Sequence, residues 1–185
     1  VDRRAFDDLA DEPLDRFGDE LCKLLARFVL QRLGAGDECE QMVAFDRKAR
    51  FGEALALGQA RRSFADTLDY VKAREQFGRP VGTFQALSHR LAELATETTV
   101  VRMMVDQFLE LHLEEKLTVE QAAMAKWYST EKQVQLIDRC LQLHGGYGYM
   151  REYPVARAYL DARVQTIYGG TTEIMKEIIG RSLGV

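Results

Sequence analysis

The chain has 185 residues, 46% of them hydrophobic and 29% charged, with a formal net charge of −4. That length and hydrophobic content suffice for one globular domain with a buried core, whereas the small negative charge and the lack of a lysine- or arginine-rich run argue against a nucleic-acid partner. No apolar run approaches the ~20 residues that span a bilayer, so we expect no membrane partner either.

The three cysteines, Cys22, Cys39 and Cys140, stand far apart and form no CxxC pair. This spacing predicts neither a zinc site nor a disulfide framework, and it fits a reducing compartment. The first residues are acidic and lack the hydrophobic core of a secretory signal. We therefore predict a cytoplasmic protein without a metal site.

Apolar residues recur every three or four positions along most of the chain, which is the period of an amphipathic α-helix. In residues 1–44 this pattern predicts one helix, which begins near Pro13 and ends at Gly34. Three long helices are expected next, at residues 46–75, 83–114 and 118–144. The segment Phe77–Pro80 should break the chain between the first two of them.

Clear start signals mark the later helices. Thr118 and Gln121 have the spacing of a capping box. Pro154 should open a shorter helix, because proline is favoured in the first helical turn. A last helix is expected from Thr171 to about Leu183.

Short breaks join the long helices, so consecutive helices should pack antiparallel. The predicted fold class is therefore all-α, an antiparallel helical bundle over residues 45–185, with residues 1–44 as a separate amphipathic helical segment. No internal repeat or low-complexity tract interrupts the chain.

Three short segments contain residues that a helical bundle does not need. The first reads REQFGRP at residues 74–80 and continues with TFQ at residues 83–85. Arg74 could simply complement the dipole at the end of a helix. Its guanidinium could also grip a phosphate through two hydrogen bonds.

The second segment reads QLHGGYGY at residues 142–149. A single glycine here could only stop a helix, but three glycines among aromatic residues suggest backbone that a ligand can touch. No Cys, Asp or Glu at metal-ligand spacing surrounds His144, so a structural role is favoured over a catalytic one.

The third segment reads IYGGTTEIM at residues 167–175. A Gly-Gly-Thr turn that leads into a helix presents free N–H groups, which bind anions or carbonyl oxygens. The simpler alternative is that Thr171 only caps the helix.

In this order and at these intervals, the three segments closely resemble the acyl-CoA dehydrogenase family, and the third is nearest to its long-chain type. The resemblance covers about residues 45–185 and implies the C-terminal, flavin-binding helical domain of that family. It therefore implies an oxidoreductase lineage in which acyl-CoA thioesters undergo α,β-dehydrogenation.

By this resemblance the cofactor is FAD, and its binding residues are Arg74, Phe77, Gln85, Gln142, Gly145, Gly146, Thr171 and Glu173. Arg74 and Gln85 would contact the pyrophosphate and adenosine portion. Gln142 and the two glycines would line the same dinucleotide, and Thr171 and Glu173 would lie near its adenine half. In the family these contacts run partly across a subunit interface, so we expect a homo-oligomer and a partial site in each chain.

The resemblance also locates the general base of the reaction, a glutamate that takes the α-proton while the β-hydride passes to the flavin. That glutamate occupies one of two positions, which here are Gly169 and Lys48. Neither is a carboxylate, and a lysine with an ordinary pKa of about 10 stays protonated at neutral pH. Glu173, four residues after Gly169, could share its helix face and substitute, but a helix-start role is favoured.

The family's β-domain, which covers the flavin ring, has no counterpart that we recognise in residues 1–44. We therefore expect the chain alone to be inactive, as a degenerate or truncated family member. One alternative is a subunit or fragment of an active dehydrogenase completed by a β-domain-containing partner. Another is a helical scaffold that has lost the flavin.

Overall fold

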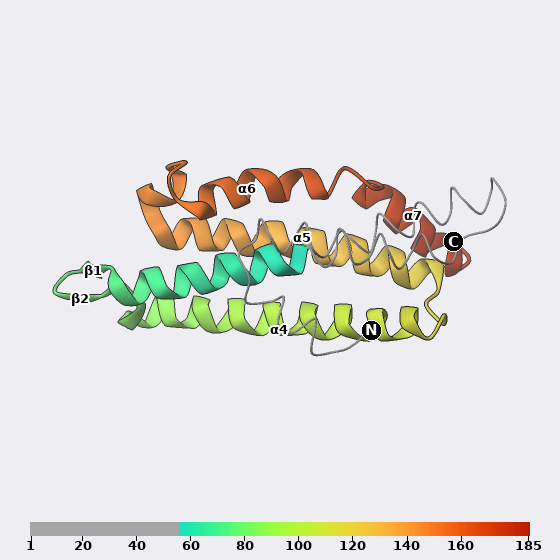
Figure 1. Ribbon diagram of the computed structural model, residues 1–185, viewed down its shortest axis with the longest axis horizontal. Helices are drawn as coiled ribbons and strands as arrows, with labels where there is room; N and C mark the ends of the chain where they lie inside the picture. The colour runs from blue at the N-terminus through green and yellow to red at the C-terminus, as the bar shows by residue number, and fades with distance from the viewer. Residues whose placement is uncertain (1–55) are drawn as a thin grey trace. The chain divides into compact units, whose positions relative to one another are not determined.

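The computed structural model describes residues 56–185. Within this range the protein is a bundle of α-helices with one short β-hairpin (Figure 1). The elements in chain order are a helix at residues 56–73, β1 (Glu75–Gln76), β2 (Arg79–Pro80), the 3-10 helix η1 (Val81–Thr83), α4 (Gln85–Leu113), α5 (Val119–His144), the 3-10 helix η2 (Gly145–Tyr149), α6 (Pro154–Gln165) and α7 (Thr172–Ser182). The predicted all-α fold is confirmed.

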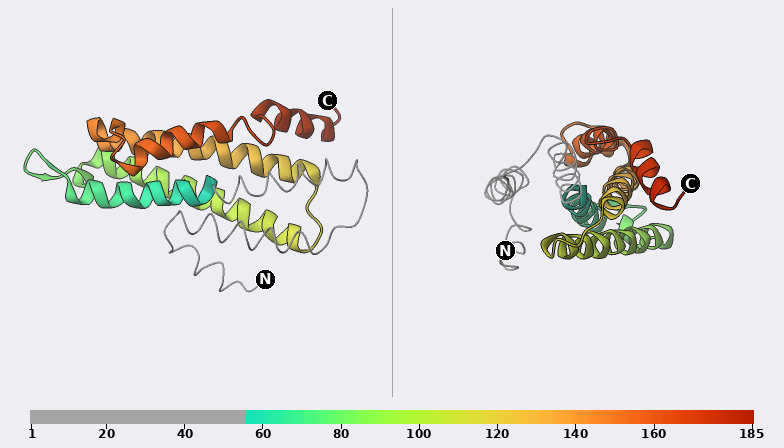
Figure 2. Two further views of the ribbon diagram at one scale, coloured as in Figure 1. Left: turned by 45° about the horizontal axis from the view of Figure 1, so that its top comes forward. Right: turned by 90° about the vertical axis from the view of Figure 1, so that its right-hand side faces the viewer.

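Consecutive long helices run in opposite directions. In Figure 1 the helix of residues 56–73 leads to the hairpin at one end of the bundle, α4 runs away from that end, and α5 returns to it. The chain then turns through η2, and α6 runs back along α5. The central helix is α5, because α4, α6 and α7 all pack on it (Figure 2).

Local capping fixes where the later helices start. The Thr118 hydroxyl accepts a hydrogen bond from the Gln121 N–H at 3.4 Å, and the Gln121 side chain accepts one from the Thr118 N–H at 3.0 Å. Pro154 opens α6, where a missing N–H costs nothing. The Thr171 hydroxyl accepts from the Ile174 N–H at 3.4 Å and caps α7. All three predicted helix starts are confirmed to within one residue.

The core at the middle of the bundle combines branched and small side chains. Its buried members are Ala60, Leu94, Leu136, Ile137, Cys140, Val155, Ala158 and Ala162. The alanines allow α6 and the helix of residues 56–73 to lie close to α5. Burial raises the pKa of the Cys140 thiol to about 11, so this thiol stays neutral and serves as a small apolar core group.

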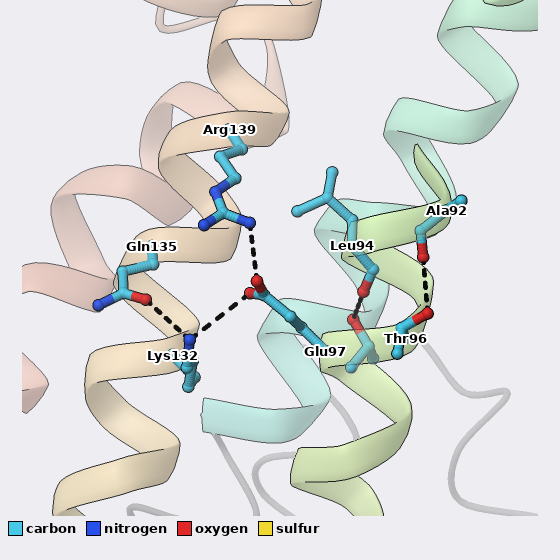
Figure 3. A network of polar contacts seen from close by, with 8 residues as sticks. Ala92, Leu94, Thr96, Glu97, Lys132, Gln135 and Arg139 are labelled. Atoms are coloured by element: carbon cyan, nitrogen blue, oxygen red, sulfur yellow. Dashed lines mark hydrogen bonds and ion pairs between the residues drawn. The ribbon is translucent and has the colours of Figure 1, made fainter. Parts of the chain in front are cut away.

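A polar contact also joins α4 to α5 (Figure 3). The Arg139 guanidinium donates to a Glu97 carboxylate oxygen at 2.9 Å, and the Lys132 ammonium lies 3.8 Å from the other oxygen. These three side chains keep between 24% and 36% of their surface exposed. Water therefore screens the ion pairs, which help to align the two helices more than they add stability.

The β-hairpin was not predicted, because two-residue strands are too short to show a period-2 pattern. Glu75 pairs with Pro80, and Gln76 pairs with Arg79. Phe77 and Gly78 form the turn with φ angles of 54° and 77°, the left-handed combination of a type I′ hairpin. The segment expected to break the helix thus folds back on itself.

The predicted helix in residues 1–44, the domain boundary at residue 45 and Lys48 lie outside the described residues. Among residues 56–185, no helix combines the length and apolar character needed to cross a membrane. In the same range, no group of three or more His, Cys, Asp or Glu side chains is arranged to hold a metal ion.

Candidate functional site

The first two sequence segments meet at the hairpin end of the bundle. Arg74 follows the helix of residues 56–73, and Tyr147 lies in η2, directly after α5. The Arg74 guanidinium carbon lies 5.5 Å from the centre of the Tyr147 ring. Arg74 is exposed, so its N–H groups can reach a ligand at this surface.

A cluster of aromatic side chains packs beside Arg74 and Tyr147. The Tyr70 ring stacks on His144 with 4.3 Å between ring centres, and its hydroxyl donates to the His144 carbonyl at 3.3 Å. Burial raises the pKa of Tyr70 against the opposing effect of Arg74, so its hydroxyl stays protonated. His144 is buried, and its Nδ1–H donates to the Cys140 carbonyl at 2.9 Å. These contacts give His144 a role in packing.

The hairpin tip displays an aromatic side chain. Phe77 is 92% exposed and has a left-handed φ angle, which costs a non-glycine residue about 1–2 kcal/mol. Its ring meets the Phe84 ring edge-on at 6.2 Å, and the Arg79 guanidinium lies 4.1 Å from the centre of Phe84. An exposed phenylalanine held in a strained conformation is more typical of a binding surface than of a fold determinant.

The glycines of the second segment have two different roles. A Cβ atom at Gly145 or Gly146 would meet nothing within 4 Å, so a ligand can approach their backbone. A Cβ atom at Gly148 would lie 2.4 Å from the Leu141 carbonyl oxygen, so Gly148 allows η2 to pack on α5. The expectation that all three glycines expose backbone to a ligand was therefore wrong for Gly148.

The two predicted glutamines belong to the same end of the bundle. Gln85 is the first residue of α4, and Gln142 lies in the last turn of α5. Both are exposed. Arg74, Phe77, Gln85, Gln142, Gly145 and Gly146 thus lie at the end of the bundle where the hairpin is found (Figure 1).

The third segment borders a separate groove of about 450 Å³ between α5, α6 and α7. Its polar and charged lining residues are Glu131, Gln135, Arg163, Thr166, Thr171, Thr172, Glu173 and Lys176. The Thr172 hydroxyl is buried and has no hydrogen-bond partner. A buried, unpartnered hydroxyl in a groove lining suggests a polar ligand there.

The Glu173 carboxylate interacts with the first turn of α7, the helix to which it belongs. Its own backbone N–H and the Thr171 hydroxyl, with the nearby charges of Lys176 and Arg163, hold the pKa of this carboxyl below its usual value. Gly169 lies in the turn before α7 with a φ angle of 66°, so the two residues do not share a helix face. That expectation was wrong, because the helix begins only at Thr172.

The two groups of predicted cofactor residues do not meet within one chain. Lys126 contacts the third segment through Gly170, whereas His144 ends α5 at the hairpin end. The α5 residues that line the groove, from Glu131 to Gln135, lie 9 to 13 residues before His144, which corresponds to about 14–20 Å of helix. One chain therefore has two separate candidate surfaces.

Two residues beside these surfaces were not singled out in the sequence analysis. Tyr70 supports the hairpin corner through its stacking on His144. Lys126 is 2% exposed and donates to the Gly170 carbonyl. The one hint for Lys126 is its position three and four residues after Ala123 and Ala122, on the same face of the helix. Both alanines are buried, and a buried helix face rarely contains a lysine.

Comparisons with known proteins agree with this architecture. The family model described as "Acyl-CoA dehydrogenase, C-terminal domain" matches residues 39–184. The mitochondrial long-chain specific acyl-CoA dehydrogenase of Sus scrofa is 50% identical over 129 residues, which cover 70% of this chain and 30% of that protein. The chain spans about a third of the length of the curated relatives it matches.

Solved structures give the same result. An acyl-CoA dehydrogenase from Geobacillus kaustophilus is 42% identical with a TM-score of 0.76, over 78% of this chain and 38% of that chain. Butyryl-CoA dehydrogenase from Megasphaera elsdenii is 35% identical with a TM-score of 0.75, also over 78% of this chain and 38% of that chain. The similarity thus lies in one helical domain of longer proteins.

Proposed function

Because this chain belongs to the acyl-CoA dehydrogenase family, we propose that it binds FAD through the ADP portion of the dinucleotide. We further propose that the chain by itself does not dehydrogenate acyl-CoA thioesters. The observation that carries the first proposal is the contact of Arg74 with Tyr147 in η2, the same short helix that holds Gly145 and Gly146 with open backbone.

The hairpin end suits a nucleotide. The exposed Arg74 guanidinium can form two hydrogen bonds to a phosphate, and Phe77 offers an exposed aromatic face for a flat ring. Gly145 and Gly146 leave their backbone open to close approach. A cation, an aromatic face and bare backbone are what a phosphate-linked adenosine needs.

The groove at α7 suits a phosphate or ribose. The first turn of α7 has N–H groups that favour anions, Arg163 and Lys176 add positive charge, and the Thr172 hydroxyl lacks a partner. Glu131 and Glu173 offset part of that charge. Because Glu173 is tied to its own helix start, we assign it a supporting place beside the cofactor.

The separation of the two surfaces supports a site shared between subunits. With about 14–20 Å of α5 between them, the hairpin end of one copy could complete the α7 groove of another. The C-terminal helix offers apolar surface for such pairing, since Ile174 and Leu183 are 51% and 72% exposed. We therefore propose a homo-oligomer in which each FAD touches two copies.

When bound, FAD supplies a hydride acceptor. The protein must then supply a base for the α-proton, positioned within hydrogen-bond reach. Gly169 has no side chain to do so, and Lys48 is a cation at neutral pH. The Gly169 backbone N–H could hold a carbonyl oxygen, but it cannot accept a proton.

A second candidate is a subunit of an active dehydrogenase completed by a β-domain-containing partner. The observation in its favour is an exposed apolar stripe on one side of α6 and the turn that follows. Leu160, Val164 and Ile167 are 58%, 49% and 53% exposed at helical spacing. A stripe of this kind is expected where another domain or subunit packs.

Titration calorimetry of the purified chain with FAD, ADP and riboflavin tests the proposal. We expect FAD and ADP to bind competitively and riboflavin to bind weakly, because the contacts are to the ADP portion. Flavin absorbance in the purified protein would add support. Absence of any FAD binding would instead favour a helical scaffold without a flavin.

A further inference from the structure

Lys126 is a buried charged side chain in the first third of the central helix α5. Among residues 56–185 it is the only lysine, arginine, aspartate or glutamate that is buried, with 2% of its surface exposed. Removing an ammonium group from water is costly unless polar partners replace the water. Its Nζ donates to the Gly170 carbonyl oxygen at 2.5 Å, in a contact between α5 and the turn before α7.

The hydrogen bonds that close the turn beside Lys126 are local ones, between residues 163 and 172. Gly169 and Gly170 have φ angles of 66° and 100°, and glycine pairs lose much conformational freedom when they are fixed. Within the turn, the Thr172 N–H donates to the Thr166 carbonyl at 3.2 Å. The Lys126 bond ties this closed turn to the body of the bundle.

We propose that Lys126 is a positioning residue for the α7 groove. Its hydrogen bond to the Gly170 carbonyl fixes the turn at residues 166–171. Because this turn leads directly into α7, it sets the positions of Thr172 and Glu173 along the groove. This inference rests on the proposed binding of FAD at that groove. It adds a residue that makes no ligand contact itself.

The protein contains a natural reporter of this geometry. Trp127 is the one tryptophan of the chain and follows Lys126 on α5. The Lys176 ammonium of α7 lies 4.8 Å from the centre of the Trp127 ring. The indole Nε1 is buried without a hydrogen-bond partner, so a shift of α7 would admit water and move the emission to longer wavelength.

The test compares Lys126→Met with Lys132→Met in the full chain. Both changes remove a lysine from α5 and keep an unbranched side chain, but Lys132 contacts Glu97 of α4 and the Gln135 side chain instead of the turn before α7. We expect Lys126→Met to keep its helical circular dichroism, to shift Trp127 emission to the red and to weaken FAD binding by at least about tenfold, the scale of a hydrogen bond from a charged donor. Lys132→Met should leave the emission unchanged, and it should weaken FAD binding less than Lys126→Met does, because only the Gln135 side chain of the groove loses a contact.

Unchanged emission and affinity in a folded Lys126→Met protein would overturn the proposal. If wild type binds no FAD, the proposed function fails, and the Trp127 emission alone then decides the role of Lys126. Gly170→Ala gives a second approach from the turn, because alanine does not tolerate a φ angle of 100° and the carbonyl must move.

If Lys126→Met does not fold, Gly170→Ala alone tests whether the turn controls the α7 groove. It should reproduce the emission shift and the weaker binding, and a normal spectrum with normal affinity would overturn the proposal. Where both variants fold, their effects on FAD affinity should be strongly non-additive in the double mutant, because both act through one hydrogen bond. If the two changes in FAD binding free energy simply add, Lys126 does not act through the Gly170 carbonyl.

Discussion

The Arg74 guanidinium carbon lies 5.5 Å from the centre of the Tyr147 ring, across the gap between the hairpin and η2. An exposed cation–π contact of this kind is worth about 0.5–1 kcal/mol. It holds the long Arg74 side chain against η2, which also contains Gly145 and Gly146 with open backbone. The position of Arg74 therefore depends on a part of the chain far away in sequence.

Arg74→Ala should weaken FAD binding by about 1–3 kcal/mol, the scale of a charge-assisted hydrogen bond. The physical reason is loss of the cation that we propose to grip the phosphates. Titration calorimetry of wild type and variant measures the difference. Arg102→Ala is the matched control, because Arg102 is an exposed arginine on α4 that pairs with Asp106. Equal affinity of the Arg74 variant and wild type would remove Arg74 from the site.

The helices could be predicted because their signals are local. The spacing of apolar residues along α4 and α5, the Thr118–Gln121 capping box and Pro154 each act within one or two turns. The predicted ends of α4 and α5 agree with the structure to within two residues. The segments that carry the candidate site were also visible, because clusters of glycine are unusual in a helical bundle.

The arrangement of those segments could not be predicted. Arg74 and Tyr147 meet, and Lys126 meets Gly170, only because α5 packs between distant parts of the chain. The strands of the hairpin are too short for a periodic signal. The opposite roles of Gly146 and Gly148 depend on which side of η2 faces α5, which the spacing of glycines does not reveal.

We expect light scattering at micromolar concentration to give the mass of a dimer or a larger oligomer. Ile174→Asp and Leu183→Asp should each weaken association by about 1–2 kcal/mol, because a charge would replace apolar surface at the proposed interface. Gln107→Asp adds the same charge at an exposed position of α4 and serves as the control. A stable wild-type monomer would contradict the prediction, and equal effects of all three variants would place the interface elsewhere.

Glu173→Gln should destabilise the protein in a pH-dependent way. Its own backbone N–H, the Thr171 hydroxyl and nearby cations lower the pKa of Glu173 in the folded state. A lowered pKa contributes stability that is fully present above the unfolded value of about 4.3 and is lost as the pH falls through the folded value. The difference in Tm between wild type and Glu173→Gln should therefore be largest near neutral pH and should shrink below about pH 4.

Thr171→Ala provides the control for this prediction. Without the Thr171 hydroxyl, Glu173 loses one of the partners that stabilise its charged form. The Glu173→Gln difference should then be smaller in the Thr171→Ala background than in wild type. A difference in Tm that does not change with pH would show that the carboxylate charge is not what stabilises α7.

Finally, the chain alone should show no acyl-CoA dehydrogenase turnover. A general base must lie within hydrogen-bond reach of the proton it takes, and it contributes about 10²–10⁴-fold to the rate. The family resemblance puts that base at one of two positions, Gly169 or Lys48, and neither is a carboxylate. Gly169 presents only backbone. Glu173 is held at the start of α7 by its own N–H and by Thr171, with a pKa below its usual value, which makes it a weaker base.

The measurement is anaerobic reduction of added FAD by acyl-CoA thioesters of several chain lengths. We expect the flavin absorbance to persist with every substrate, because an acidified α-proton has no acceptor. Slow bleaching that is equal in wild type and Glu173→Gln would indicate proton loss to water rather than to the protein. Clear bleaching by wild type that is lost in Glu173→Gln would identify Glu173 as the base. The first turn of α7 would then have to move during the reaction, because it holds the Glu173 carboxylate in place in this structure.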